Sequence, residues 1–306
     1  MNTLSAYLIV VAVWATTPLG IKWSGEAMPP WAAAGSRMAL AALLGLLWLA
    51  WRRQSLPLRR RALASYAAAL PGIFGAMGCS YVAARTLPSG LISVMFGLAP
   101  LLSGLMMQLI PGGSRLNGWH WCACVLGLLG LALVFNDSLL ALFGEGGDQR
   151  TAALGWMLVA VTLFAGSAIA VQRVAAGLAP MQQTVGGLLA SLPCYGLAIW
   201  WSGEGAGFNG DWRGLGAIVY LAVFGSLLGF YCYFQILARL PAATVALITL
   251  MTPVLALTLG ALLNEERLAL AVLVGAVVIV MALALYLLGD RRVRRGLKSG
   301  APVGER

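Results

Sequence analysis

Charged residues are scarce in this chain of 306 residues. Asp, Glu, Lys and Arg make up 10% of it and hydrophobic residues 60%, whereas soluble globular domains contain about 25% charged residues. A water-soluble fold of this length could not cover its surface with so few charges. The composition therefore excludes an ordinary soluble protein and predicts an integral membrane protein.

The chain also lacks the residues of a metal, cofactor or catalytic site. It has a single histidine, His120, and five cysteines that all fall inside apolar runs, so we predict no metal site, no disulfide and no cofactor. It contains no P-loop lysine motif, no GxSxG and no HExxH, and we expect it not to be an enzyme. Its net charge of +10 comes from short basic clusters between apolar runs, which argues against a nucleic-acid partner.

Long hydrophobic runs are abundant instead. A membrane-spanning helix needs about 20 mostly apolar residues, and the runs lack the alternating polarity of barrel strands. We therefore predict an all-α integral membrane protein with ten transmembrane helices. They lie at about residues 4–22, 31–51, 63–84, 88–110, 117–136, 153–172, 180–202, 212–237, 241–263 and 268–288.

The basic residues are unevenly divided between the two sides of the membrane. Of the 20 Lys and Arg residues, 14 lie on the side that holds both termini, five lie on the other side, and Arg37 lies inside the second span. Because short cytoplasmic loops carry the excess of Lys and Arg, we expect both termini to be cytoplasmic.

The two halves of the chain repeat one another. Pro88 and Pro100 are twelve residues apart, and so are Pro241 and Pro253. Each half holds five spans, an odd number, so the second half must enter the membrane upside down. Inverted repeats are a transporter architecture, with the substrate site near the midplane where the halves meet. At a shift of 150, Phe74, Gly75 and Tyr81 match Phe224, Gly225 and Tyr231.

The repeat suggests a division of the chain into three parts. We expect a first repeat at residues 1–147, a second, inverted repeat at 148–289 and a basic cytoplasmic tail at 290–306.

The first two spans carry four notable residues in a fixed sequence. Trp14 begins a polar patch, Lys22 follows it, Pro30 precedes the second span and Arg37 lies within that span. The mid-span prolines and the sequence NEERL that follows the ninth span, with its Glu266, add to the pattern. This order resembles the EamA-type branch of the drug/metabolite transporter superfamily, although the first repeat reads PGGSRL and lacks the glutamate.

The resemblance covers about residues 4–288 and implies a mode of action. It implies a central cavity lined by spans 1–4 and 6–9, with alternating access to it and no ATP hydrolysis. Spans 5 and 10 are expected at the periphery or at a contact between two copies, so a homodimer is possible. The expected location is a bacterial inner (plasma) membrane, in contact with its lipids.

Polar and helix-breaking residues at membrane depth suggest a site. Arg37 can offer a positive charge to a carboxylate, or its side chain can snorkel to the interface, and Lys22 can be interfacial or part of a gate. No carboxylate lies inside a span, which disfavours cation/proton exchange. The candidate substrate-binding residues are Trp14, Thr17, Arg37, Tyr81, Met95, Phe96, Phe164, Ser167, Tyr231, Thr249 and Thr252, and the candidate hinge or gate residues are Pro18, Lys22, Pro100, Pro253 and Glu266.

These observations favour a secondary transporter that exports amino acids or related zwitterionic or anionic solutes. For any one aromatic candidate, helix packing or lipid contact is the alternative to a place in the cavity. The alternative functions are a flippase for a lipid-linked substrate and an exporter of multiple drugs or cationic solutes.

Overall fold

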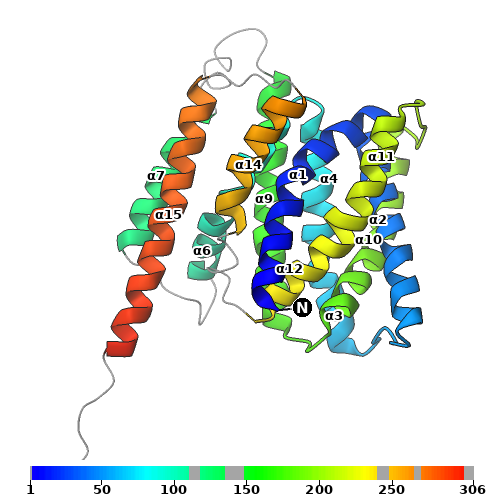
Figure 1. The fold of residues 1–306 in the computed structure, drawn as a ribbon, viewed down its shortest axis with the longest axis horizontal. Coiled ribbons are helices and arrows are strands. Elements are labelled where there is room, and N and C mark those ends of the chain that lie inside the picture. Colours follow the sequence, from blue (N-terminus) through cyan, green and yellow to red (C-terminus); the bar gives the residue numbers. More distant parts are fainter. Residues whose placement is uncertain (1, 110–117, 135–147, 240–247, 265–269, 300–306) are drawn as a thin grey trace, which may run out of the picture.

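The computed structural model describes residues 2–109, 118–134, 148–239, 248–264 and 270–299. All regular structure in these ranges is helical, and seven of the membrane-crossing rods are long and apolar enough to span a bilayer by themselves. The beginning of α1 and the end of α15 lie at the same end of the molecule (Figure 1). We call this end the terminal face and the opposite end the far face.

Ten helical rods run between the two faces, in agreement with the ten predicted spans. They form two inverted five-helix repeats, and three of the rods are composite. The simple rods are α1 (Thr3–Ala27), α2 (Pro30–Trp51), α7 (Gly118–Val134), α9 (Asp148–Val174), α10 (Pro180–Ser202), α14 (Ile248–Leu263) and α15 (Leu270–Ser299). The composite rods join α3 (Arg60–Leu70), η1 (Pro71–Ala76) and α4 (Met77–Ala84), then α5 (Ser89–Phe96) and α6 (Ala99–Leu109), then α11 (Trp212–Tyr220), η2 (Leu221–Leu228) and α12 (Gly229–Leu237).

Local sequence explains where several helices begin and end. The Asn2 side chain accepts a hydrogen bond from the Ser5 backbone N–H at 2.7 Å and so caps the start of α1. Pro30 stands at the first position of α2, where its missing N–H has no helical partner to lose. Gly203 ends α10 in the left-handed conformation, with φ of 66°.

Three of the predicted spans are composite rods in the structure. α5 stops at Phe96 and α6 starts at Ala99, just before Pro100, because a proline ring clashes with the preceding helical turn. Two further rods each contain a π-helical segment, η1 and η2, and these segments begin 150 residues apart. Wider π turns free backbone groups locally and are frequent at functional sites.

The contact between α2 and α10, the second helices of the two repeats, shows that the repeats are inverted. A Cβ added at Gly35 would lie 3.3 Å from Tyr195 Cβ, and one added at Gly45 would lie 2.6 Å from a Val185 methyl group. The two helices therefore run antiparallel, and glycines bring their backbones close together.

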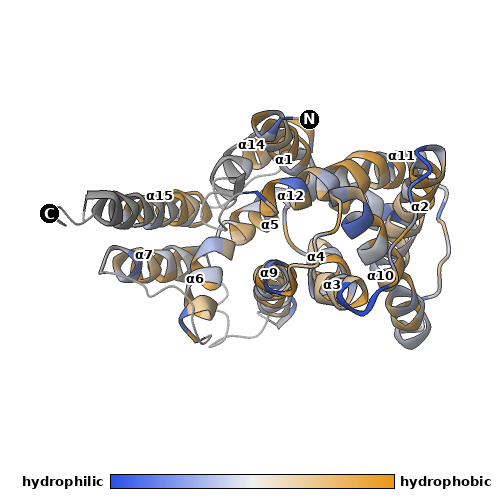
Figure 2. Cartoon of the chain, turned by 90° about the horizontal axis from the view of Figure 1, so that it is seen from below, coloured by the Kyte–Doolittle hydropathy of each residue, from blue (hydrophilic) through white to orange (hydrophobic). Residues whose placement is uncertain are grey.

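α7 and α15 pack against each other at one side of the molecule, and the other rods gather beside them (Figures 1 and 2). This is the peripheral position that the resemblance implies for spans 5 and 10. Their outward faces carry exposed apolar side chains, among them Trp121, Leu128, Leu273 and Val277.

Candidate functional site

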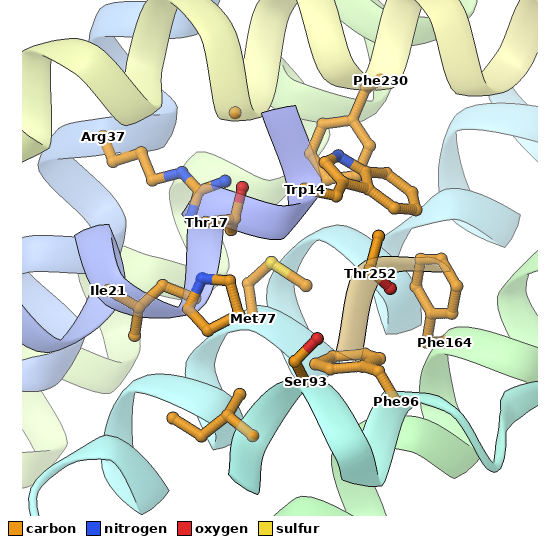
Figure 3. A pocket seen from close by; sticks show the side chains of 13 residues that line it. Trp14, Thr17, Ile21, Arg37, Met77, Ser93, Phe96, Phe164, Phe230 and Thr252 are labelled. Carbon is orange, nitrogen blue, oxygen red and sulfur yellow. The ribbon is translucent and has the colours of Figure 1, made fainter. Parts of the chain in front are cut away.

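A small cavity lies between the two repeats. Its volume is about 60 Å³, which is room for on the order of four water molecules. Figure 3 shows its walls. The lining side chains are Trp14, Thr17, Pro18 and Ile21 of α1, Arg37 of α2, Met77 of α4, Ile92, Ser93 and Phe96 of α5, Phe164 of α9, Phe230 of α12 and Thr252 of α14, with Gly225 of η2.

Arg37 supplies the charge of this cavity. Its side chain is 1% exposed, and its guanidinium points toward Thr17 and the middle of the cavity (Figure 3). Nε donates a hydrogen bond to Ser226 Oγ at 2.7 Å, whereas Nη1 is buried without a hydrogen-bond partner in the described part of the chain. The side chain thus lies in the cavity and not at the membrane interface.

The η2 segment is shaped to receive this guanidinium. A Cβ at Gly225 would lie 3.0 Å from Arg37 Nη2 and 3.1 Å from a methyl group of Leu221, so the glycine keeps Nη2 clear. The next residue, Ser226, is fully buried, and its hydroxyl also lies 3.5 Å from Met38 Sδ. One face of η2 therefore holds Nε through Ser226 and makes room for Nη2 at Gly225.

Aromatic rings form the side of the cavity opposite the guanidinium (Figure 3). Trp14 meets Phe164 edge to face, with ring centroids 5.8 Å apart, and meets Phe230 in the same manner at 6.4 Å. Phe96 meets Phe164 at 5.7 Å. Trp14 and Phe164 are themselves 150 residues apart, so each repeat contributes one of the two central rings.

A second, larger cavity opens toward the terminal face. It measures about 400 Å³ and lies among the ends of α3, α9, α10 and α12. Ser65 and Gln183 hold one wall, because the Ser65 hydroxyl donates to Gln183 Oε1 at 2.6 Å and Gln183 Nε2 donates to the Ser65 carbonyl at 3.1 Å. Tyr233 and Phe234 pack between this cavity and the central one, in ring contact with Phe164 and Phe230.

Polar contacts tie α1 to its neighbours toward the far face. Lys22 Nζ donates to the Ala84 carbonyl at 3.5 Å, and Trp23 Nε1 donates to Asn264 Oδ1 at 3.0 Å. Glu26 forms an ion pair with Arg213 at 2.9 Å. Lys22 therefore lies outside the central cavity, in a set of contacts that joins α1 to α4, to the end of α14 and to α11.

The structure brings part of the predicted site together. Seven of the predicted residues line the central cavity: Trp14, Thr17, Pro18, Arg37, Phe96, Phe164 and Thr252. They come from α1, α2, α5, α9 and α14, which are far apart in the sequence.

Four predicted binding residues lie outside the lining of this cavity. Met95 is fully buried in the apolar core, and Tyr81 is buried with its hydroxyl 3.1 Å from that of Ser24. The Ser167 hydroxyl donates to the Ala68 carbonyl at 2.8 Å, toward α3. Tyr231 packs against a separate apolar cluster formed by residues of α2 and α10. In each case the helical rotation turns the side chain away from the cavity.

Of the remaining predicted residues, one is described in full and three fall wholly or partly outside the described part of the chain. Pro100 is buried at the start of α6. Thr249 and Pro253 fall within α14, but their side chains are outside the described part, and Glu266 lies outside the described residues altogether.

The sequence did not point to every residue of the site. Ser226, the partner of Arg37, and the lining residues Met77, Ile92 and Phe230 were not singled out. Phe230 stands next to Tyr231, and in an apolar helix no hydrophobic periodicity shows which of the two faces inward. No group of three or more His, Cys, Asp or Glu side chains gathers in the described ranges.

Known proteins resemble this chain over nearly its whole length. The model of the EamA-like transporter family matches residues 2–136 and 151–288. A protein of Escherichia coli K12 described as a probable amino-acid metabolite efflux pump is 26% identical over 305 residues, covering 96% of this chain and 97% of its own. An uncharacterized inner membrane transporter of the same strain, YedA, is 26% identical over 299 residues, covering 93% and 90%.

The fold also has a solved counterpart. A structure described only as a crystal structure of a protein superposes with a TM-score of 0.68 at 20% identity, over 95% of this chain and 98% of that one. This likeness concerns the fold alone.

Proposed function

Because the chain belongs to the EamA-like transporter family, we propose that it is a secondary transporter that exports small carboxylate-bearing metabolites, namely amino acids or related zwitterionic or anionic solutes. The single observation that carries this proposal is Arg37, a fully buried cation that points into a cavity between two repeats. A buried cation without an acidic partner is costly in a membrane, Arg37 has none among the described residues, and a carboxylate would compensate it.

Alternating access between the repeats is the proposed mechanism. The central cavity of about 60 Å³ is far below the roughly 300 Å³ of a typical ligand pocket, so it must widen when a solute enters. The cavity of about 400 Å³ at the terminal face is the proposed entry, and the Tyr233 and Phe234 rings are its proposed inner gate. The ties of Lys22, Trp23 and Glu26 form the proposed outer gate.

The proposed orientation puts the terminal face in the cytoplasm. It rests on the 14 Lys and Arg residues on the side of the termini against five on the other. We place the protein in a bacterial inner membrane, as is stated for the relative YedA. Residues 1–147 and 148–289 are the two proposed moving units, and 290–306 the cytoplasmic tail.

Transport is tested in liposomes. Purified protein is reconstituted into vesicles loaded with labelled amino acids and organic carboxylates, and release is followed. We expect protein-dependent release of carboxylate-bearing solutes, reduced at least about tenfold in Arg37→Gln because a charged hydrogen bond is lost. Arg61→Gln, at an exposed arginine of α3, is the control and should release solute normally. Equal release from protein-free vesicles for every solute would contradict the proposal.

One observation favours the second candidate, a flippase for a lipid-linked substrate. An apolar groove of about 340 Å³ runs between α1, α11 and α14, with Arg213 and Trp23 among its lining residues. A lipid-linked substrate would place its chain in this groove. Loss of transport on introducing bulk there, with Gly216→Leu, together with retained transport in Arg37→Gln, would support this candidate over the first.

A further inference from the structure

We propose that the central cavity recognises a monoanionic carboxylate joined to an apolar or aromatic body, and that it does not recognise an ammonium group. This inference rests on the proposed function and narrows its substrate class. It predicts that an organic acid anion is a better ligand than the amino acid of the same shape.

The first argument is the charge of the cavity. Among the described residues that line it, Arg37 is the one charged side chain, and none is an Asp or Glu. The ion pairs of Arg85 with Glu204 and of Arg213 with Glu26 involve partly exposed side chains away from this cavity. With a monocarboxylate the site becomes neutral. With a zwitterion it keeps one uncompensated positive charge, and with an amine it holds two, which is costly at membrane depth.

The second argument is the geometry of the guanidinium. A guanidinium donates through Nε and both Nη atoms, and two parallel N–H groups suit the two oxygens of a carboxylate. In Arg37 the Nε donor is taken by Ser226 Oγ at 2.7 Å, and Nη1 has no partner among the described residues. The absence of a side chain at Gly225 leaves Nη2 clear. Nη1 is therefore a donor left for a ligand, which reaches it when the cavity widens.

The third argument is the rest of the wall. Opposite the guanidinium the cavity offers the rings of Trp14, Phe96, Phe164 and Phe230 (Figure 3). The Thr17 hydroxyl is turned to its own helix, where it donates to the Val13 carbonyl at 2.9 Å. These rings suit an apolar or aromatic body. No carboxylate among the described lining residues is present to receive an ammonium.

Three compounds that share one phenyl body separate the possibilities. Hydrocinnamate carries only the carboxylate, phenylalanine carries both groups, and phenethylamine carries only the ammonium. Binding to the purified wild-type protein is measured by calorimetry, and release of each labelled compound from proteoliposomes by flux. We expect hydrocinnamate to bind at least about tenfold more tightly than phenylalanine, since one buried charge is left unpaired in the zwitterion, and phenethylamine not to bind.

Variants test the role of Arg37 in the same measurements. Arg37→Lys keeps the charge and loses the paired donors, so hydrocinnamate affinity should fall about tenfold. Arg61→Gln should bind as the wild type does. Because the comparison of the three compounds uses the wild-type protein, a folding defect in a variant leaves it intact.

Each result decides between the claims. Tighter binding of phenylalanine than of hydrocinnamate, with both released by the protein, would overturn this inference and leave the proposed function standing. Tightest binding of phenethylamine would overturn it as well, because the rings would then hold a cation. No protein-dependent release of these compounds or of any solute in the wider panel would remove the proposed function itself.

Discussion

Each repeat bends one helix into a π-helical segment, and the two segments begin 150 residues apart. A buried side chain from the opposite repeat holds each segment. On η1, the Tyr195 hydroxyl of α10 donates to the carbonyl of Ile73 at 2.8 Å. On η2, Nε of Arg37 in α2 donates to Ser226 Oγ at 2.7 Å. The two segments correspond, but the residues that hold them do not, since at the shift of 150 Arg37 matches Gly187 and Tyr195 matches Gly45, and the chemistry of the two contacts differs.

The difference between the two contacts indicates different roles for η1 and η2. A phenol has one hydrogen to donate, and Tyr195 uses it on the backbone of η1, so this contact is complete. Arg37 keeps Nη1 without a partner in the described chain while Nε is bonded. We infer that the η1 contact stabilises the fold, whereas the η2 contact positions a binding group and can respond to a ligand.

The largest effects are expected from replacing Arg37 and Tyr195, one at a time, by an apolar residue. One replacement should change mainly ligand affinity and the other mainly stability. Arg37→Met should lower hydrocinnamate affinity by at least about tenfold and leave the melting temperature unchanged or raised, because an unpaired buried charge disappears. Tyr195→Phe should keep the affinity and lower the free energy of unfolding by about 1 kcal/mol. Calorimetry and thermal unfolding in detergent measure the two effects.

The opposite pattern would contradict the comparison. If Tyr195→Phe weakened binding as much as Arg37→Met did, the two contacts would be equivalent.

Adding a methyl group to each segment is the next test. Gly225→Ala would place its Cβ 3.0 Å from Nη2 of Arg37, and we expect hydrocinnamate affinity to fall about fivefold as the guanidinium shifts. Gly75→Ala, the matched position, would meet the end of the flexible Leu163 side chain, and affinity should change by less than about twofold. Calorimetric titration of each variant with hydrocinnamate gives its loss of affinity relative to the wild type. Equal losses would show that helix packing, and not the guanidinium, governs affinity.

Thr17 and Ser167 are also 150 residues apart. Removing their hydroxyls should give the smallest difference between matched positions, in the free energy of unfolding. Ser167→Ala removes the bond to the Ala68 carbonyl of another helix, and the free energy of unfolding should fall by about 0.6 kcal/mol. Thr17→Val removes a bond to the Val13 carbonyl within α1, and stability should change by less than about 0.5 kcal/mol. Chemical unfolding in detergent is the measurement. A larger loss of stability in Thr17→Val than in Ser167→Ala would contradict this expectation.

The spans were predictable because their signal is strong. About 20 apolar residues in succession have few structures open to them in a bilayer, and the ten predicted segments match the ten rods. The break before Pro100 was also open to prediction, since proline interrupts a helix. The π turns of η1 and η2 were not, because no residue type specifies a wider turn and only η1 starts with a proline.

The cavity was predictable only in part. Arg37 stood out because a charge inside a span is rare and costly, and the repeat pointed to the interface between the halves. Its partner Ser226 comes from 189 residues away in the chain, and a serine in an apolar helix has many other uses. Tyr81 and Met95 looked as suitable as Phe96, but both are turned into the core.

By itself, the amino-acid sequence determined the membrane class, the number of spans and the inverted repeat, because hydrophobic length and loop charge act locally along the chain. Only the tertiary structure decided which face of each helix looks inward. In a membrane, lipid-facing and core-facing side chains are both apolar, so no periodicity marks the inner face. That choice put Arg37 in one cavity with the rings of Trp14 and Phe164 and so decided the character of the site.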